Sequence, residues 1–493
     1  MGYAGPVRRA LVLLVAVSLP LIAGGCGSSS SSTGPSPLAT ELSYFPPGSP
    51  LMATIATDPQ GSAVQNAEGL LGAFPLAKLG ITGLESELES AGVDYQSEIE
   101  PLFGNPIAVG ALALPTSAQL SGSSFLAVWI TKSAAKLHTL IKGLNGFTAR
   151  GTVDGATLYG SGAATLALDG ATVIVGASRA EVSAALGRHA HGGGMSAADY
   201  AKAMGSLPQH SLVQAFGSLS SVLSAPSAAA ARRIPWVAAI RGYAASVSVT
   251  SAGLSVQFRL DTSGASLSGS ELPISSGTAA AQLSGTLPTA VGVRDGAQTL
   301  SFAESVERSV DPASYARFMG RENAAKRKTG YDLNTFAALL TGNLIVESDT
   351  RTTMGRAEVS DPASAARQLA KLPEVVREVF HTASGISRLP GGFYAVKEGR
   401  GKTFNLGLVG NEFVAGLATA AQLEAFAAAP AAPAPNVQGS VAFRISLLEL
   451  LKLALRHTPN SLITSVLSTL GDVTGSASAT PGALTGRLGL AVK

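Results

Sequence analysis

A short stretch occurs twice in this sequence: residues 92–109 read GVDYQSEIEPLFGNPIAV, and residues 330–347 read GYDLNTFAALLTGNLIVE. The two stretches align without a gap at an offset of 238 (330 − 92), and six of the eighteen positions are identical. With ordinary residue usage, about one identity would arise by chance. The repeat therefore predicts a duplicated domain, and the identical pairs are Gly92/Gly330, Asp94/Asp332, Leu102/Leu340, Gly104/Gly342, Asn105/Asn343 and Ile107/Ile345.

The first repeated residues have the chemistry of helix ends. Gly92 and Gly330 follow helix-like runs, and glycine suits the left-handed position that closes a helix. Asp94 and Asp332 stand where a side-chain oxygen accepts hydrogen bonds from the free amides of the next helix. A pair of acid/base carboxylates is the alternative. Capping is favoured because no partner acid repeats beside either aspartate.

The end of the repeat predicts a short helix followed by a strand. Gly104 and Gly342 are expected to close that helix. The residues that follow, 106–114 in the first copy and 344–347 in the second, are apolar enough for a strand that enters a core. Asn105 and Asn343 lie at this junction.

Outside the repeat, helical patterns alternate with short apolar segments. V-D-G and L-D-G turns separate four of these segments between residues 148 and 176, which predicts antiparallel hairpins. An Ala-rich helix is expected over 228–241, before two long strands at 243–250 and 254–260. The second copy returns the same order, with matches at Pro50/Pro288 (offset 238), Gly170/Gly410 and Gly176/Gly416 (240), and Ala215-Phe216/Ala442-Phe443 (227).

The predicted fold class is α+β, with two tandem homologous lobes that each pack helices on a mainly antiparallel sheet. The Ser-, Gly- and Ala-rich stretch between the copies is the expected linker. The predicted divisions are a signal peptide at 1–25, a tether at 26–43, lobe 1 at 44–261, a linker at 262–285 and lobe 2 at 286–493.

The N-terminus predicts export and lipidation. Arg8 and Arg9 precede an apolar run at 11–22 that is too short for a settled membrane span, and small residues precede Cys26. This arrangement fits a bacterial lipobox, in which the Cys26 thiol is acylated, with palmitate among the expected chains. The alternative is an ordinary signal peptide with an incidental cysteine. Gly27 to Pro37 reads GSSSSSTGPSP and is expected to tether the anchor to the folded body.

Composition and length limit the function, the covalent cross-links and the number of domains. The formal net charge is +3 and only 14% of the residues are charged, which gives no case for nucleic-acid binding. Cys26 is the only cysteine, so no disulfide can form within the chain. The mature chain is too long for one core, and two or more domains are expected.

The opening of the folded body, YFPPGSPLMATIATD from Tyr44, and the stretch at 92–109 resemble the bacterial envelope proteins grouped as domain of unknown function three-three-five-two. The resemblance would cover essentially the whole mature chain. It implies an extracytoplasmic location, often with a lipoprotein leader. It carries over no catalytic or ligand residue.

Two pieces of the sequence imitate penicillin-interacting serine enzymes. Ser133 and Lys136 form an S-x-x-K, and residues 328–330 read KTG. The context argues against catalysis, because no S-x-N or Y-x-N element lies between them and the two pieces belong to different copies. The KTG also ends a basic helix, whereas the chemistry needs it on a strand.

Two further motifs have simpler interpretations. Gly401-Lys402-Thr403 lacks the first glycine of a phosphate-binding loop, since position 396 is Val396, and its surroundings predict a strand–turn–strand hairpin. His189 and His191 have no third ligand at a metal-site spacing, so a polar loop is favoured and no metal or other cofactor is expected.

The two copies differ in charge. Residues 41–100 hold nine acids, among them Glu85, Glu87 and Glu89, whereas the matching helix of the second copy ends in Lys326, Arg327 and Lys328. Helix-terminal cations and a solvated acidic face are the favoured interpretation. The alternative is that the basic helix contacts anionic lipid or wall polymer. Trp129 and Trp236 are too few for a sugar-binding platform.

The sequence therefore predicts a non-enzymatic lipoprotein, anchored in the cell membrane by its N-terminal lipid and facing the extracytoplasmic side. Two roles remain open: binding of an apolar or amphiphilic envelope ligand, and protein interaction or scaffolding at the cell surface. A lipid or an envelope protein is the expected partner. A large apolar pocket would favour the first role.

Overall fold

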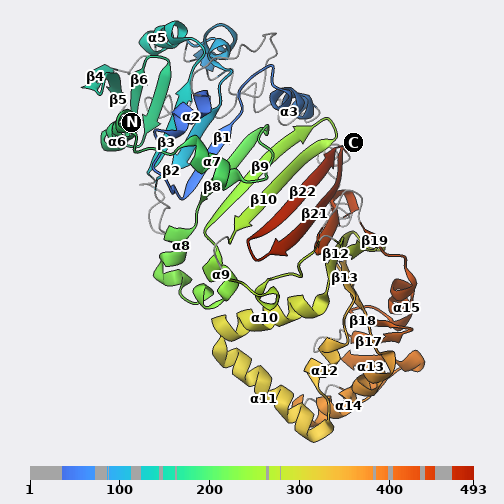
Figure 1. Cartoon of the computed structure of the whole chain (residues 1–493). Helices are drawn as coiled ribbons and strands as arrows, with labels where there is room; N and C mark the ends of the chain where they lie inside the picture. Colours follow the sequence, from blue (N-terminus) through green and yellow to red (C-terminus); the bar gives the residue numbers. More distant parts are fainter. Residues whose placement is uncertain are drawn as a thin grey trace, which may run out of the picture. The chain divides into compact units, whose positions relative to one another are not determined.

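The structure is a computed structural model, and it divides the chain into two compact units (Figure 1). Unit 1 comprises the described parts of Met1–Val222, with Arg241–Arg259 and Val492. Unit 2 comprises Leu223–Ile240 and Leu260–Ala491. The structure describes residues 36–72, 86, 88–90, 92–112, 124–143, 148–160, 164–262, 266–277, 279–380, 385–397, 403–433, 439–449 and 469–492.

Unit 1 combines helices with antiparallel strands. Its described helices and helical turns are α2 (Pro37–Leu42), α3 (Ser62–Gly72), η1 (Tyr95–Ile99), η2 (Glu100–Leu102), α5 (Ala134–Gly143), α6 (Arg179–His191), α7 (Ala197–Met204) and the start of α8 (Ser220–Ser224). Its strands are β1 (Leu51–Ile55), β2 (Ile107–Ala111), β3 (Phe125–Ile130), β4 (Thr148–Val153), β5 (Ala156–Gly160), β6 (Thr165–Asp169), β7 (Thr172–Gly176), β8 (Val213–Ser218), β9 (Gly242–Thr250) and β10 (Gly253–Asp261).

The strands of unit 1 are hydrogen-bonded in the order β4–β5–β6–β7–β3–β2–β1–β8–β9–β10. Apolar side chains alternate between the two faces of this sheet, so each face supports a core. On one face, α6 packs through Val182 and Leu186 against Leu158 and Ile174. On the other face, α5 packs against a cluster that contains Trp129.

Unit 2 is built from the same kinds of element. Its described helices and helical turns are η4 (Pro226–Ala228), η5 (Ala231–Arg233), α9 (Pro235–Ala239), η6 (Gly269–Glu271), α10 (Gly296–Val310), α11 (Pro312–Thr329), α12 (Leu333–Ala338), α13 (Pro362–Leu369), α14 (Leu372–Val375), η7 (Val376–Phe380), η8 (Pro390–Gly392) and α15 (Ala420–Ala428). Its strands are β11 (Gln282–Leu283), β12 (Thr289–Arg294), β13 (Asn343–Ser348), β14 (Thr353–Glu358), β15 (Ile386–Arg388), β16 (Tyr394–Lys397), β17 (Thr403–Val409), β18 (Glu412–Gly416), β19 (Ala432–Pro433), β20 (Val441–Ser446), β21 (Leu470–Thr480) and β22 (Ala483–Val492).

The main strands of unit 2 follow the order β15–β16–β17–β18–β14–β13–β12–β20–β21–β22. Strand by strand, this is the order found in unit 1. Again one face carries a helix that follows the central hairpin, α15, packed through Leu423 and Phe426. The opposite face carries α12 and α13, packed through Phe336 and Leu369.

Strand register shows which residues occupy the same place in each unit. Gly176 pairs with Leu126 and Gly416 pairs with Met354, in keeping with the offset of 240 read from the sequence. The ungapped alignment at 238 does not continue into the strands, however. Ile107 pairs with Ile55, whereas Ile345 pairs with Gly292.

The register therefore makes Leu344 the positional counterpart of Ile107, one residue earlier than the sequence alignment. The match of Ala215-Phe216 with Ala442-Phe443 also shifts by one residue. Ala215 pairs with Ala53, and its positional counterpart in unit 2 is Phe443, which pairs with Val291. The shift places Ile107 and Ile345 in clusters on opposite faces of their sheets, because successive side chains of a strand point to opposite faces.

Three predicted element bounds differ from the structure. The tether expected over 26–43 ends in α2, whose Glu41 and Leu42 are buried. The helix expected over 228–241 is divided into η4, η5 and α9, because Pro235 cannot continue a helix from the preceding turn. The stretch expected to link the lobes packs onto unit 2: Leu272, Ala281 and Leu283 are buried, and Thr262 donates from its hydroxyl to the Pro481 carbonyl at 2.8 Å. Its apolar residues are spaced irregularly, so their burial left no periodic signal.

Candidate functional site

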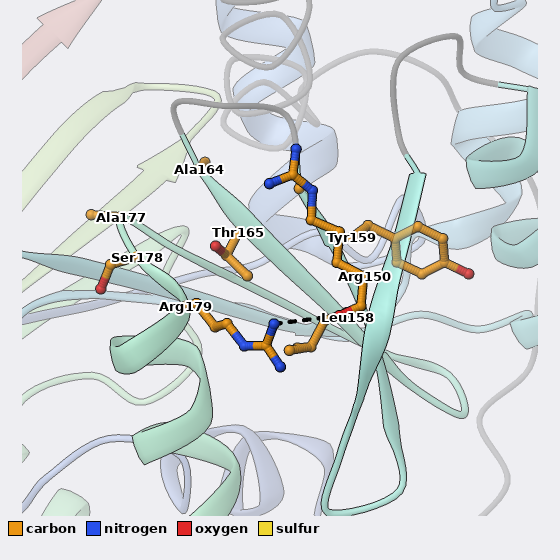
Figure 2. A pocket seen from close by; sticks show the side chains of 9 residues that line it. Arg150, Leu158, Tyr159, Ala164, Thr165, Ala177, Ser178 and Arg179 are labelled. Atoms are coloured by element: carbon orange, nitrogen blue, oxygen red, sulfur yellow. Dashed lines mark hydrogen bonds between the residues drawn. The ribbon is translucent and has the colours of Figure 1, made fainter.

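A pocket of about 270 Å³ lies at the end of the unit 1 sheet, between β5, β6 and the start of α6. Figure 2 shows the side chains of Arg150 and Arg179 there, with Thr165 between them in this view. The pocket has mixed walls, because Leu158 contributes hydrocarbon while the two arginines contribute positive charge. The complete lining is Arg150, Leu158, Tyr159, Gly160, Ala164, Thr165, Ala177, Ser178 and Arg179.

Local structure positions both arginines. Arg150 lies on β4, at a break in the register with β5, and its side chain crosses Gly160 so closely that a Cβ there would lie 2.6 Å from Arg150 Nε. Arg179 is the first residue of α6, whose N-terminus is capped by Ser178. Arg179 Nη1 donates to the Arg150 carbonyl at 3.4 Å, a long hydrogen bond that links the two walls.

The corresponding place in unit 2 is filled with hydrocarbon. Tyr159 and Tyr394 occupy equivalent positions in the two sheets. Tyr159 pairs with Leu166 on β6, and Tyr394 pairs with Leu406 on β17, which has the place of β6 in unit 2. The preceding residue is Leu158 in unit 1 and Phe393 in unit 2; both side chains are 1% exposed, and the phenylalanine is the larger of the two.

The two arginines are also replaced by apolar residues in unit 2. Leu389 occupies the place of Arg150, and Ala420, the first residue of α15, occupies the place of Arg179. Leu389 and Ala420 both pack against the cluster that contains Phe393. A pocket with charged walls in unit 1 thus corresponds to a packed apolar core in unit 2.

The repeated aspartates cap helices. Ser97 N donates to Asp94 Oδ1 at 2.7 Å at the start of η1, and Thr335 N donates to Asp332 Oδ1 at 3.2 Å at the start of α12. The Ser97 amide holds the pKa of Asp94 below its usual value. The pKa of Asp332 is lowered mainly by Lys326, whose Nζ lies 2.7 Å from Asp332 Oδ2.

The repeated glycines have two different roles. Gly92 and Gly330 have φ of 78° and 69°, the left-handed conformation, and the Gly330 amide closes α11 on the Lys326 carbonyl. Gly104 and Gly342 do not end helices, contrary to the sequence prediction, since η2 ends at Leu102 and α12 at Ala338.

Gly104 and Gly342 instead leave room for a side chain. A Cβ on Gly104 would lie 1.9 Å from Lys132 Cε, and one on Gly342 would lie 2.2 Å from Glu358 Oε2. Asn105 donates from Nδ2 to the Ile130 carbonyl at 2.9 Å, which fixes the strand entry. Asn343 is the first residue of β13 and pairs with Arg294 of β12. The repeated residues are thus structural.

The residues that imitate a serine enzyme have structural roles. Ser133 Oγ accepts from the Lys136 amide at 3.3 Å at the start of α5. Lys328, in unit 2, lies in the last turn of α11 and donates from Nζ to the Glu378 carbonyl at 3.1 Å. In unit 2, Asp361 caps α13 in the way that Ser133 caps α5. Ser133 and Asp361 thus have the same capping role in the two units.

A hydroxyl–imidazole pair that the sequence did not indicate lies elsewhere in unit 1. Ser43 Oγ is 2.6 Å from His189 Nδ1, and the His189 ring stacks on Tyr44. Ser43 Oγ donates its proton to the Thr40 carbonyl at 2.6 Å. The imidazole must therefore donate to Ser43, which is the opposite of what a general base would do. The pair docks α2 onto α6.

The remaining motifs also have positions in the structure or lie outside it. His189 and His191 both lie in the last turn of α6, not in a loop, and within the described ranges no group of three or more His, Cys, Asp or Glu side chains could hold a metal. The strands that flank Lys402, β16 and β17, form an antiparallel pair. Cys26, Glu85, Glu87, Gly401 and Lys402 lie outside the described residues.

A buried carboxyl in α2 also escaped the sequence analysis. Glu41 is fully buried, and its Oε1 accepts from the Ile130 amide at 3.0 Å, while its Oε2 has no partner within the described part of the chain. Burial raises its pKa to about 9. The side chain is therefore neutral at pH 7. The signal in the sequence would have been the apolar neighbours of Glu41 in a short helix.

Comparisons with known proteins add little. The sequence matches no family model, and no curated protein matches it. Solved structures similar to this chain include crystal forms I, III and IV of a protein named TP0453, with sequence identities of 11%, 9% and 10% and TM-scores of 0.27, 0.27 and 0.28. They cover 46%, 46% and 45% of this chain and 81%, 82% and 80% of TP0453. Superposition at this level carries no argument about function. Among the described helices, none is long and apolar enough to cross a bilayer.

Proposed function

We propose that this protein is a lipid-anchored lipoprotein on the extracytoplasmic side of the cell membrane, and that unit 1 binds an amphiphilic envelope ligand without catalysis. The observation that carries the proposal is the unit 1 pocket, which presents hydrocarbon and charge together at a place that unit 2 fills. A pocket of about 270 Å³ is smaller than the usual ligand site, so it would hold one end of an amphiphile. A wholly apolar ligand fits these walls less well.

The anchor rests on the leader sequence and the resemblance to envelope proteins. Replacing Cys26 with Ser should release the folded body from membranes or stall processing of the signal peptide. Cell fractionation checks this. Normal processing and continued membrane association of the variant would contradict the anchor.

The two units fit a tandem duplication of one α+β lobe. The same strand order and the same use of Asp94 and Asp332 as caps support this origin. Duplication gives a reason for the difference between the pockets, because one copy can keep a packed core while the other acquires a binding function. The lobe-specific residues are then the place where function is expected.

Ligand binding is tested on the native lipoprotein purified from envelopes. We expect an amphiphile to be extracted with the wild type and to be lost in Leu158→Phe, which imports the side chain of unit 2 into the pocket wall. Val222→Phe, at a position 38% exposed, adds a ring outside the pocket and is the matched control. Equal lipid recovery from all three proteins would contradict binding at this pocket.

A second candidate function, protein interaction, is favoured by the α10–α11 hairpin. Leu300, Val310 and Phe318 are 46%, 52% and 41% exposed there, which is unusual for large apolar side chains. Photo-crosslinkers at Leu300 and Phe318 should trap one defined envelope partner, while a crosslinker at the exposed Ala190 of α6 should not. The same products from all three positions would contradict a specific interaction.

A further inference from the structure

The two arginines of the unit 1 pocket have no counter-charge among the described residues. Neither Arg150 nor Arg179 forms an ion pair with a carboxylate of the described chain. The nearest acid along α6 is Glu181, and its oxygens are engaged, since Oε2 accepts from the Ser178 amide at 3.0 Å and Oε1 accepts from the Ser124 hydroxyl. Two guanidinium groups therefore line one pocket without a carboxylate partner from the described part of the chain.

We infer that this pocket binds an oxyanion, a phosphate or carboxylate group, between Arg150 and Arg179. The inference rests on the proposed function, because it names the end of the amphiphile that unit 1 would hold. A guanidinium is permanently charged, and its fork of N–H donors matches the paired oxygens of a phosphate or carboxylate. A cationic or purely apolar group would leave both arginines uncompensated.

The start of α6 does not bind the anion by itself. Ser178 and Glu181 form a reciprocal cap that already satisfies amides of the first turn. The guanidinium groups supply the recognition, and they have donors to spare. Arg179 uses one N–H on the Arg150 carbonyl, and the Arg150 guanidinium makes no hydrogen bond to the described part of the chain.

The close approach to Gly160 determines where the Arg150 guanidinium lies. The Arg150 side chain crosses Gly160, and only a residue without a Cβ permits this approach. Gly160→Ala would displace the Arg150 guanidinium without removing any charge. In unit 2, Ala395 takes the place of Gly160, opposite Asn405, and it is buried. Gly160→Ala therefore tests the position of the Arg150 charge, whereas Arg150→Gln tests its presence.

The test uses the full-length lipoprotein in neutral detergent and inorganic phosphate as the probe, with binding measured by calorimetry. We expect Arg150→Gln and Arg179→Gln each to weaken phosphate binding at least tenfold. Gly160→Ala should weaken it by a smaller factor, and added salt should weaken wild-type binding. Arg317→Gln, on the exposed surface of α11, is the matched control and should bind as the wild type does.

Vesicles of phosphatidylcholine, with and without phosphatidylglycerol, distinguish a lipid head group from a free ion. Preference for the phosphatidylglycerol vesicles that is lost in both pocket variants supports a lipid source. Phosphate binding without that preference supports a free oxyanion. Absence of phosphate binding, or unchanged binding in both Gln variants with an unaltered thermal transition, overturns the inference.

The outcomes also separate the inference from the proposed function. If an amphiphile co-purifies and depends on Leu158 while phosphate does not bind, the function stands and the oxyanion inference fails. If phosphate binds through Arg150 and Arg179 while no amphiphile co-purifies, the inference stands and the amphiphile proposal fails. Both Gln substitutions alter exposed side chains, so neither should prevent folding.

Discussion

The same place in two similar sheets is a charged pocket in unit 1 and an apolar core in unit 2. Both sheets have the same strand order, and both place a helix after the central hairpin. Unit 1 has Arg150, Leu158 and Arg179 at that place, with Phe393 in unit 2 replacing Leu158. Strand order alone therefore does not make a site. A few side chains decide whether the space is filled or open.

The largest effect is expected from truncating Phe393. Phe393→Ala removes a ring that is 1% exposed, and a loss of about 3–5 kcal/mol in unfolding free energy is expected for such a cavity. Leu158→Ala should cost less, because it removes a smaller side chain, although Leu158 is also 1% exposed. Urea unfolding of both variants checks the difference. An equal or larger loss for Leu158→Ala would mean that the unit 1 wall is packed as tightly as that of unit 2.

The second comparison concerns the buried carboxyl groups. Glu41 in unit 1 has one hydrogen-bond donor, the Ile130 amide. Glu347 in unit 2 is also fully buried but accepts from the Ser284 hydroxyl at 2.8 Å, the Leu287 amide at 2.9 Å and the Thr286 hydroxyl. The Glu41 carboxyl should make stability strongly dependent on pH.

Glu41 has a folded-state pKa raised to about 9, above its value of 4.5 in the unfolded chain. Between those values the folded state keeps a proton that the unfolded state releases. Stability should therefore be highest near or below pH 4.5 for this group and fall by up to about 1.4 kcal/mol per pH unit as the pH rises toward 9. Glu41→Gln should remove that slope, and thermal unfolding at several pH values measures it.

Glu347→Gln is the matched control for Glu41→Gln. It places an amide NH2 group among donors, so a loss of about 1–3 kcal/mol is expected. Opposite signs for the two variants at pH 8 would support the assignment. A pH slope that survives in Glu41→Gln would show that another group causes it.

The smallest effect is expected at the helix caps. Asp332→Ala should lower the unfolding free energy by about 1 kcal/mol, the usual cost of losing a cap, and it also breaks the contact with Lys326. Asp94→Ala should lower the melting temperature less, because its cap lies on a single exposed turn without a basic partner. Salt should reduce the difference between the variants, since it screens the Asp332–Lys326 pair. A difference that is independent of salt would argue against the ion pair.

The sequence by itself determined the local features. The turns at Gly170 and Gly410 have φ of 57° and 62°, and the aspartates of the repeat cap helices, because these conformations depend on a few neighbouring residues. Antiparallel pairing also followed from short segments joined by tight turns. The mixed α+β composition is therefore readable from local chemistry.

Only the tertiary structure decided register, burial and the pocket. The ungapped match at Ile107 and Ile345 is off by one residue in the sheet, because cross-strand pairing and not sequence identity sets register. Gly104 and Gly342 leave room for side chains that approach from residues 28 and 16 positions away (132 − 104 and 358 − 342). Arg150 and Arg179 carry no motif in the sequence. They line one pocket because β4 and the start of α6 lie at the same end of the sheet, an arrangement that depends on packing across many strands.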